Sequence, residues 1–285
     1  MQKYKLYKLL EKKYSKFVGS KFAVSCNSGT SALHLGLKAL GVGPGDEVIV
    51  PEFTMIACAF AVSYCGATPV FVDCDETLNI NVNLIEDKIT EKTKVIMPVH
   101  VYGRLCDMKS ILKLAKKYDL KVLEDACEAQ GAVFKSKADI TAYSFYRNKI
   151  IHAEEGGIAT TDNPKYEKRM NYLKNMAFGE KHDYIHKEIA FNYRMPDGQA
   201  ELALKSLKNY PKEKKRRAKL VEKYDKKYGK TPKRDANWVY DMKKMKVKEE
   251  TREFFKPMSQ QPPYKGEYKH LRAFEKSKKG MYIVL

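Results

Sequence analysis

The 285-residue sequence lacks any run of 18 apolar residues, so we expect no transmembrane helix. Its first residues, MQKYKLYKLLEKKYSKF, lack the apolar core of a secretory signal, which favours a cytoplasmic protein. The six cysteines form neither a CxxC pair nor a cluster with histidine, which predicts reduced, mostly buried thiols and no metal site. With 44% hydrophobic and 31% charged residues, the chain is neither disordered nor collagen-like, and its length allows one large domain or two ordinary ones.

Acidic residues are scarce relative to basic ones, and the formal net charge is +19. Such a charge is typical of nucleic-acid-binding proteins. Residues 205–256, however, contain 20 Lys and Arg against 8 Asp and Glu, and few aromatic side chains lie among them before Trp238. We therefore favour a solvated lysine-rich surface over a nucleic-acid site.

Short β-branched runs alternate with amphipathic stretches through the first two thirds of the chain. The expected strands are Phe22–Cys26, Glu47–Val50, Pro69–Val72, Lys94–Pro98, Lys121–Glu124 and Thr141–Phe145. The expected helices between them are Ser31–Leu40, Ile56–Cys65, Asn83–Ile89 and Met108–Tyr118. This alternation predicts an α/β fold with a mostly parallel sheet covered on both faces, whose ligands bind at the carboxyl ends of the strands.

The pattern changes after about residue 163. Lys165–Asn175 and Gln199–Tyr228 are expected to form polar helices, and residues 231–285 to be irregular. We predict a large α/β domain over residues 1–204 and a small, basic domain over residues 205–285.

Three segments at predicted strand ends could carry chemistry. Residues 27–31 (NSGTS) open a helix, where backbone N–H groups and hydroxyls suit a phosphate, although Ser28 or Thr30 could equally be an ordinary helix cap. Asp125 could hold a cationic ring nitrogen or could cap the next segment. Lys149 could be a Schiff-base nucleophile or a surface residue. Together, a phosphate cradle, a carboxylate and an amine are the set that pyridoxal phosphate requires.

Six motifs occur in order between about residues 20 and 210, and a weaker match resumes in TREFFKPMSQQPPY and KKGMYIVL. They are SGTSALHLGLKALGVGPGDEVIVPEFT, GATPVFVD, TKVIMPVHVYG, KVLEDACEAQGA, YSFYRNKIIHAEEGG and FNYRMPDGQAELAL. With these motifs the chain resembles the DegT/StrS-type sugar aminotransferases, which have the aspartate-aminotransferase fold (fold type I) and use pyridoxal phosphate.

The resemblance implies a role for each matching residue. Lys149 would bind the cofactor covalently, and Asp125 would pair with its pyridine nitrogen. The other cofactor-binding residues would be Thr30, Ser31 and Ser144 at the phosphate, Met55, Glu128, and Asn192 from the partner subunit. Substrate-binding residues would be Arg194, His186 and Arg252. The family is dimeric with active sites at the interface, so we expect a homodimer with shared sites.

Finer features of the resemblance indicate the reaction. Glu128, three residues after Asp125, and the FFKPMSQQPPY segment resemble the members that convert GDP-4-keto-6-deoxymannose to its 4-amino sugar with glutamate as amino donor. Related dehydratases have His in place of Lys149, so Lys149 favours transamination. Met55 stands where relatives place an aromatic ring, Gln130 replaces a frequent His, and the C-terminal domain is reduced. A different keto-sugar substrate and a degenerate, non-catalytic basic binding protein therefore stay as alternatives.

Overall fold

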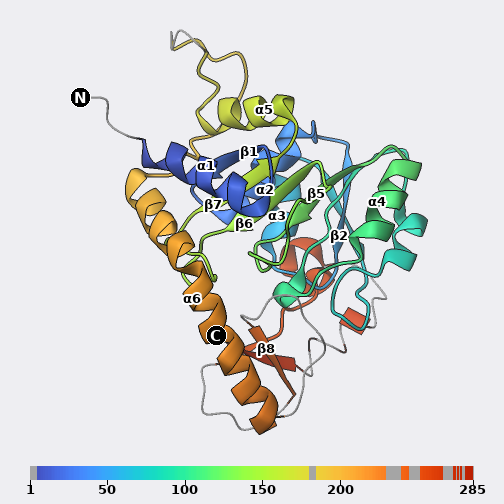
Figure 1. The fold of residues 1–285 in the computed structure, drawn as a ribbon. Helices are drawn as coiled ribbons and strands as arrows, with labels where there is room; N and C mark the ends of the chain where they lie inside the picture. Colours follow the sequence, from blue (N-terminus) through green and yellow to red (C-terminus); the bar gives the residue numbers. More distant parts are fainter. Residues whose placement is uncertain are drawn as a thin grey trace.

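A computed structural model of the chain describes residues 5–179, 184–228, 239–243 and 251–265, and from the end of the chain 272, 273, 275, 277 and 280–284. Seven strands form the main sheet in the order β1-β7-β6-β5-β4-β2-β3 (Figure 1). Their bounds are β1 Phe22–Cys26, β2 Glu47–Pro51, β3 Thr68–Val72, β4 Thr93–Ile96, β5 Lys121–Asp125, β6 Ile140–Ser144 and β7 Gly157–Thr161. Only β7 runs antiparallel to its neighbours, so the expected mostly parallel α/β sheet is confirmed.

Helices cover both faces of this sheet, because successive strand residues contribute apolar side chains to opposite sides. One face packs against α2 Gly29–Ala39, α3 Ala57–Tyr64 and α5 Pro164–Lys174. The other packs against α1 Leu6–Val18, α4 Met108–Lys117 and α6 Asp197–Tyr228. None of the helices in the described ranges combines the length and apolar character needed to cross a membrane.

Several sequence-based expectations about individual elements were wrong or incomplete. Residues 83–89 form parts of two short 3-10 helices, Val82–Leu84 and Glu86–Lys88, instead of one α-helix. Two elements were missed, α1 and β7; α1 has a buried stripe of Leu10, Tyr14 and Val18 at the spacing of a helix face. β7, with the sequence GIATT, lacks the alternation that would reveal a strand.

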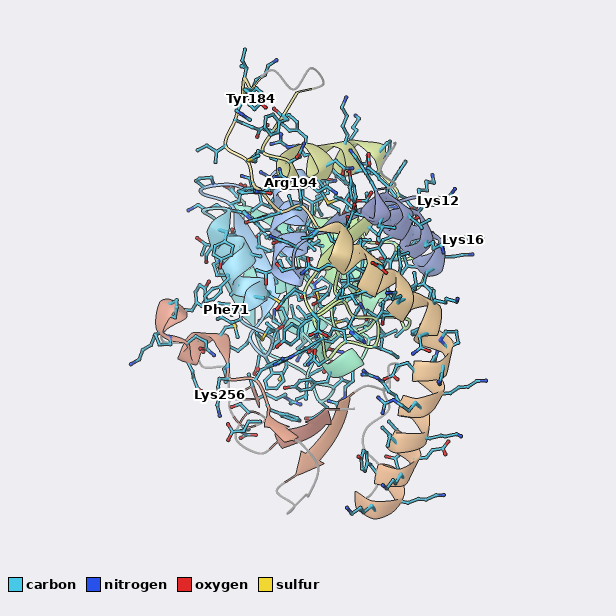
Figure 2. The ribbon with its side chains drawn as sticks, turned by 90° about the vertical axis from the view of Figure 1, so that its left-hand side faces the viewer. Lys12, Lys16, Phe71, Tyr184, Arg194 and Lys256 are labelled. Carbon is cyan, nitrogen blue, oxygen red and sulfur yellow. The ribbon has the colours of Figure 1, made fainter. Side chains whose placement is uncertain are left out.

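The C-terminal part is more regular than expected. β8 Val239–Lys243, β9 Thr251–Glu253 and β10 Gly280–Val284 form a small antiparallel sheet in the order β8-β10-β9. This sheet and the C-terminal half of α6 extend from the same end of the α/β body (Figures 1 and 2). The helix α6 runs without a break across residue 204. The division of the chain into two domains at that residue stays a prediction.

A buried ion pair ties α1, β1 and α5 together. The Nζ of Lys174 lies 3.0 Å from Oε1 of Glu11 and donates to the Ser25 carbonyl, while the Ser25 N–H and hydroxyl both donate to Oε1 at 2.9 Å. Burial opposes ionisation of Glu11, but Lys174, the Ser25 N–H and Lys8 outweigh it and lower the pKa of Glu11 below 4.5. The pair is thus satisfied although Glu11 and Lys174 are each only 6% exposed.

We predict that Lys174→Met lowers the free energy of unfolding by about 3 kcal/mol at pH 7, since it leaves the Glu11 carboxylate buried without its partner. The stabilisation from Glu11 is present above its unfolded-state pKa of 4.5 and is lost as pH falls through the lower folded-state value. Urea titrations should therefore show a smaller difference from the original chain at pH 3 than at pH 7. The exposed Lys16 on α1 (Figure 2) provides the control Lys16→Met, and an equal effect of both variants would contradict the account.

Candidate active site

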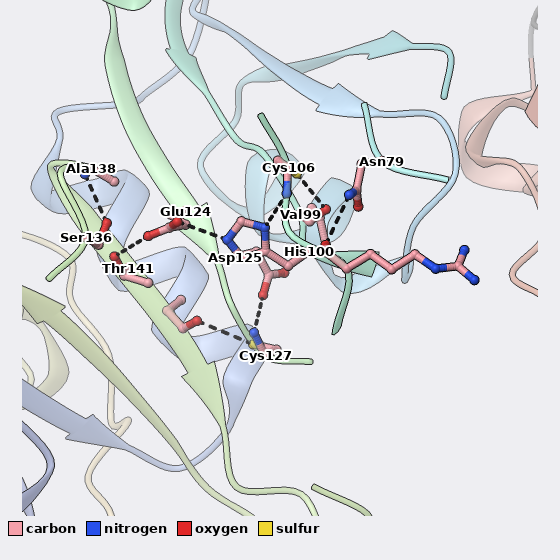
Figure 3. Close-up of polar contacts among 12 residues, drawn as sticks. Asn79, Val99, His100, Cys106, Glu124, Asp125, Cys127, Ser136, Ala138 and Thr141 are labelled. Atoms are coloured by element: carbon pink, nitrogen blue, oxygen red, sulfur yellow. Dashed lines mark hydrogen bonds and ion pairs between the residues drawn. The ribbon is translucent and has the colours of Figure 1, made fainter. Parts of the chain in front are cut away.

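Asp125 ends β5 at the carboxyl edge of the sheet, where its backbone N–H and its carbonyl both bond to the segment that follows β4. Its N–H donates to the Pro98 carbonyl at 2.9 Å, and its own carbonyl accepts from the His100 N–H at 3.1 Å. The side chain is 4% exposed, and Oδ1 accepts from the Cys127 N–H at 2.9 Å (Figure 3). The position of this carboxylate is therefore fixed by the sheet itself.

The neighbouring residue of β5, Glu124, joins β5 to β6 and to the segment that follows β4 (Figure 3). Nδ1 of His100 accepts from the Cys106 N–H at 3.1 Å, so Nε2 carries the proton and donates to Oε1 of Glu124 at 2.9 Å. Thr141 on β6 donates to the second Glu124 oxygen at 2.9 Å. These bonds fix the strand ends from which the residues of the site extend.

Lys149 and Glu128 form a second polar pair beyond the ends of β6 and β5. Nζ of Lys149 lies 3.5 Å from Oε1 of Glu128, and the two side chains are 12% and 13% exposed. Oε2 of Glu128 accepts from the Tyr102 N–H at 2.8 Å. Burial raises the pKa of Glu128, while the Lys149 charge and the Tyr102 N–H oppose the shift. The site thus pairs an amine with a carboxyl whose tendency to hold a proton is increased.

The start of α2 carries the hydroxyl groups predicted for a phosphate. Ser28 is the helix cap, and its Oγ accepts from the Ser31 N–H at 3.1 Å. The Ser31 hydroxyl lies 2.8 Å from that oxygen and donates to Oδ1 of Asn27 at 2.6 Å. Ser28 therefore caps the helix and also belongs to a polar cluster with Asn27 and Ser31. Ser31 and the adjacent Thr30 are two of the residues predicted to bind the phosphate.

Two glycines let this helix start approach the strands closely. A Cβ on Gly29 would lie 2.8 Å from Cβ of Ser144 and 3.2 Å from Sγ of Cys127. A Cβ on Gly157 would lie 2.1 Å from the Ser28 carbonyl oxygen. The absence of side chains at both positions places the Ser144 hydroxyl, at the end of β6, against the N-terminus of α2.

Met55 lies between β2 and α3 and is 51% exposed. Its carbonyl accepts from the N–H of Cys58, whose side chain contacts Asp125. The backbone of Met55 is thus bonded to the residue that contacts Asp125, while Met55 itself is half exposed. Gln130, the other departure from the motif, is buried and joins Ser144 to Ile151: its amide donates to the Ser144 carbonyl at 2.7 Å and accepts from the Ile151 N–H at 2.9 Å.

The three residues His186, Asn192 and Arg194 lie on a segment that ends before α6, and Figure 2 shows Tyr184 and Arg194 far from Lys256. His186 donates to the Met176 carbonyl, and Arg194 donates to Asn175 at 3.0 Å. Asn192 and Arg194 border a hollow of about 1420 Å³ whose lining includes neither Lys149 nor Asp125. Within one subunit, these residues are therefore separate from the Lys149 pair, although Asn27 at the start of α2 lines the same hollow.

Tyr102 and Glu52 hold the C-terminal segment, residues 253–265, beside the site, and the sequence did not predict this role for them. The Phe255 N–H donates to the Tyr102 hydroxyl at 3.0 Å, and the two rings stack at 4.9 Å. The buried Glu52, at the end of β2, accepts from the N–H of Ser259 at 2.9 Å and from its hydroxyl. The aromatic pair in the FFKPMSQQPPY motif was the available signal. The backbone of Arg252 lies in β9, and its side chain falls outside the part of the chain that is described.

Asp125 ends β5, Glu128 and Lys149 follow β5 and the neighbouring β6, and Ser144 at the end of β6 lies against the N-terminus of α2. The sequence profile of the DegT/DnrJ/EryC1/StrS aminotransferase family matches residues 1–244, and the chain belongs to that family.

Two curated relatives match 69–76% of this chain at higher sequence identity than the solved structures. A GDP-perosamine synthase from Caulobacter vibrioides is 44% identical over 223 residues, which are 76% of this chain and 60% of that protein. A GDP-perosamine synthase from Escherichia coli O157:H7 is 44% identical over 203 residues, which are 69% of this chain and 56% of that protein. The chain therefore spans less than two thirds of the length of these relatives.

Solved structures show the same fold over nearly the whole chain. DesV of S. venezuelae, determined in complex with a ketimine intermediate, matches with a TM-score of 0.88 and 28% identity, covering 98% of this chain and 84% of DesV. A putative sugar aminotransferase from Streptococcus pneumoniae, in its PLP form, matches with a TM-score of 0.87 and 28% identity, covering 98% of this chain and 86% of that one. The expected fold of the pyridoxal-phosphate-dependent sugar aminotransferases is confirmed.

We predict that Gly29→Ala lowers the free energy of unfolding by about 1–3 kcal/mol, because the new methyl group overpacks against Ser144 and Cys127. Gly43→Ala is the matched control, since a Cβ there meets nothing within 4 Å. Urea unfolding of both variants checks the prediction. Equal stability of the two would show that α2 does not press against β6 as described.

Proposed function

We propose that this protein is a pyridoxal-phosphate-dependent aminotransferase that acts on a nucleotide-linked 4-keto-6-deoxy sugar. The observation that carries the proposal is the largely shielded Lys149–Glu128 pair, in which Glu128 also experiences the charge of Asp125. Two features support the fit of the cofactor: the donor set contains a shielded primary amine, a buried carboxylate and clustered hydroxyls, and Gly29 leaves Ser144 against the helix start.

Each residue has a role that follows from its chemistry. Lys149 would hold the cofactor through Nζ, Asp125 would keep a proton on the pyridine nitrogen, and the hydroxyls of Thr30, Ser31 and Ser144 would hold the phosphate. Met55 would cover the exposed side of the ring with its thioether, which packs on aromatic faces. When bound, the cofactor supplies an electron sink for the carbanion at the amino-acid α-carbon.

Lys149 also moves the proton that the reaction requires. Once its Nζ is free, it acts as a general base on the α-carbon of the amino donor, and later as the acid that returns the proton. Glu128 accepts a hydrogen bond from Nζ and orients it. Because burial raises the pKa of Glu128, this carboxyl is suited to share the proton that Nζ gains and loses.

We further propose glutamate as the donor and GDP-4-keto-6-deoxymannose as the acceptor, as for a GDP-perosamine synthase. This is supported by the 44% identity to two proteins of that name and by Glu128. The C-terminal segment fastened to Tyr102 and Glu52 would form a wall of the sugar site, with Arg252 and His186 as candidate contacts. Another keto sugar is the second candidate, since a relative at 40% identity is a dTDP-3-amino-3,6-dideoxy-alpha-D-galactopyranose transaminase.

We expect purified protein with added pyridoxal phosphate to show the visible absorbance of the lysine-bound cofactor, and Lys149→Ala to lose it. Glutamate should bleach the band, and only the correct keto sugar should then restore it. GDP-4-keto-6-deoxymannose should act at least tenfold faster than a dTDP-linked 3-keto-6-deoxy sugar, the kind of substrate from which a 3-amino sugar forms. Lys116→Ala, an exposed lysine on α4, is the control.

Two outcomes of this experiment would contradict parts of the proposal. A protein that stays colourless with added cofactor would overturn the enzymatic function and favour a basic binding protein. A band that glutamate bleaches but only another sugar restores would overturn the sugar assignment alone.

We also propose a homodimer in which Asn192 and Arg194 reach the site of the partner subunit. Their position on a hollow away from Lys149 supports a role outside their own subunit's site. Mixing inactive Lys149→Ala with inactive Arg194→Ala, after gentle unfolding and refolding together, should restore activity, because a mixed dimer has one intact site. No recovery, with dimers demonstrated by ultracentrifugation, would contradict the shared site.

A further inference from the structure

The buried side-chain environment of Asp125 contains an unusual donor. Cys58, in the first turn of α3, is 0% exposed, and its Sγ–H donates to Oδ2 of Asp125 at 3.2 Å. The opposite carboxylate oxygen accepts a full-strength backbone bond from Cys127 at 2.9 Å. The two oxygens of Asp125 therefore have partners of very different strength, since a thiol is a weak donor.

The direction of the thiol bond follows from its surroundings. Burial, followed by the Asp125 charge, raises the pKa of the Cys58 thiol well above its usual range, so the sulfur keeps its proton. Oγ1 of Thr54 lies 3.4 Å from the same sulfur. Because the single S–H proton faces Asp125, Thr54 is the donor in that second contact, and the order is Thr54 hydroxyl, Cys58 thiol, Asp125 carboxylate.

We propose that Cys58 tunes the charge of Asp125: its weak S–H bond withdraws little charge from Oδ2 and so leaves most of that charge for the cofactor's pyridine nitrogen. This inference rests on the proposed function. A hydroxyl at the same place would donate more strongly and withdraw charge from Oδ2, whereas an alanine would withdraw none. The identity of residue 58 therefore sets how strongly Asp125 retains the protonated ring.

The first experiment uses the cofactor-free full-length protein. The infrared S–H stretching band of Cys58, isolated by subtracting the spectrum of Cys58→Ala, should lie at lower frequency than the band of Cys65 isolated with Cys65→Ala. Asp125→Asn should move the Cys58 band to higher frequency, because a neutral amide is a weaker acceptor than a carboxylate. A Cys58 band that Asp125→Asn leaves unchanged would overturn the proposal.

The second experiment measures the dissociation constant of pyridoxal phosphate by titration of its absorbance. Cys58→Ser should weaken binding about fivefold, whereas Cys58→Ala should bind at least as tightly as the original chain. Cys65→Ala is the control for loss of a buried thiol at the other end of α3. Weaker binding by both variants at position 58 would indicate a packing role and overturn the proposal.

The two experiments separate this inference from the proposed function. If neither the original chain nor any variant binds the cofactor, the proposed function fails. The infrared band still decides in that case whether Cys58 donates to Asp125. If the cofactor binds and the two substitutions shift the dissociation constant in the same direction, the proposed function stands and the role of Cys58 fails.

Discussion

The structure depends on a carboxylate that is held in the sheet, Asp125 at the last position of β5. Hydrogen bonds from its backbone N–H to the Pro98 carbonyl and from the His100 N–H to its own carbonyl fix it to the segment that follows β4. A charge that is 4% exposed needs partners, and here they come from a backbone N–H and a thiol. The side chains around Asp125, Lys149 and Glu128 among them, take their positions from strands whose ends the His100–Glu124–Thr141 network holds in register.

The α/β class and the strands β1 to β6 could be predicted from local pattern, because β-branched runs alternate with amphipathic stretches. The same pattern put Asp125 at a strand end and Ser31 at a helix start, whereas the roles of these residues and of Lys149 stay proposals that rest on the family resemblance. β7 could not be predicted, since its five residues are small and carry no alternation. The contact of Cys58 with Asp125 joins residues 67 apart in sequence, and that of Glu52 with Ser259 joins residues 207 apart. Such contacts depend on tertiary packing, for which a single sequence has no periodic signal.

The segment after α6 bears on the proposed substrate, because residues 253–265 lie beside the candidate site. This chain spans 56–60% of the length of two curated relatives. After α6, the described residues include Phe255 and Ser259, whose contacts fasten residues 253–265 to Tyr102 and Glu52. Most of the basic excess noted in the sequence lies in and after α6.

The central claim is that Lys149, held beside Glu128 and Asp125, is the attachment point of pyridoxal phosphate. Borohydride reduction of the protein with added cofactor, followed by peptide mass spectrometry, tests it most directly. The account predicts one modified lysine, located at Lys149, although the chain contains many lysines that are more exposed. Modification at other lysines with Lys149 unlabelled, or no modification, would contradict the account.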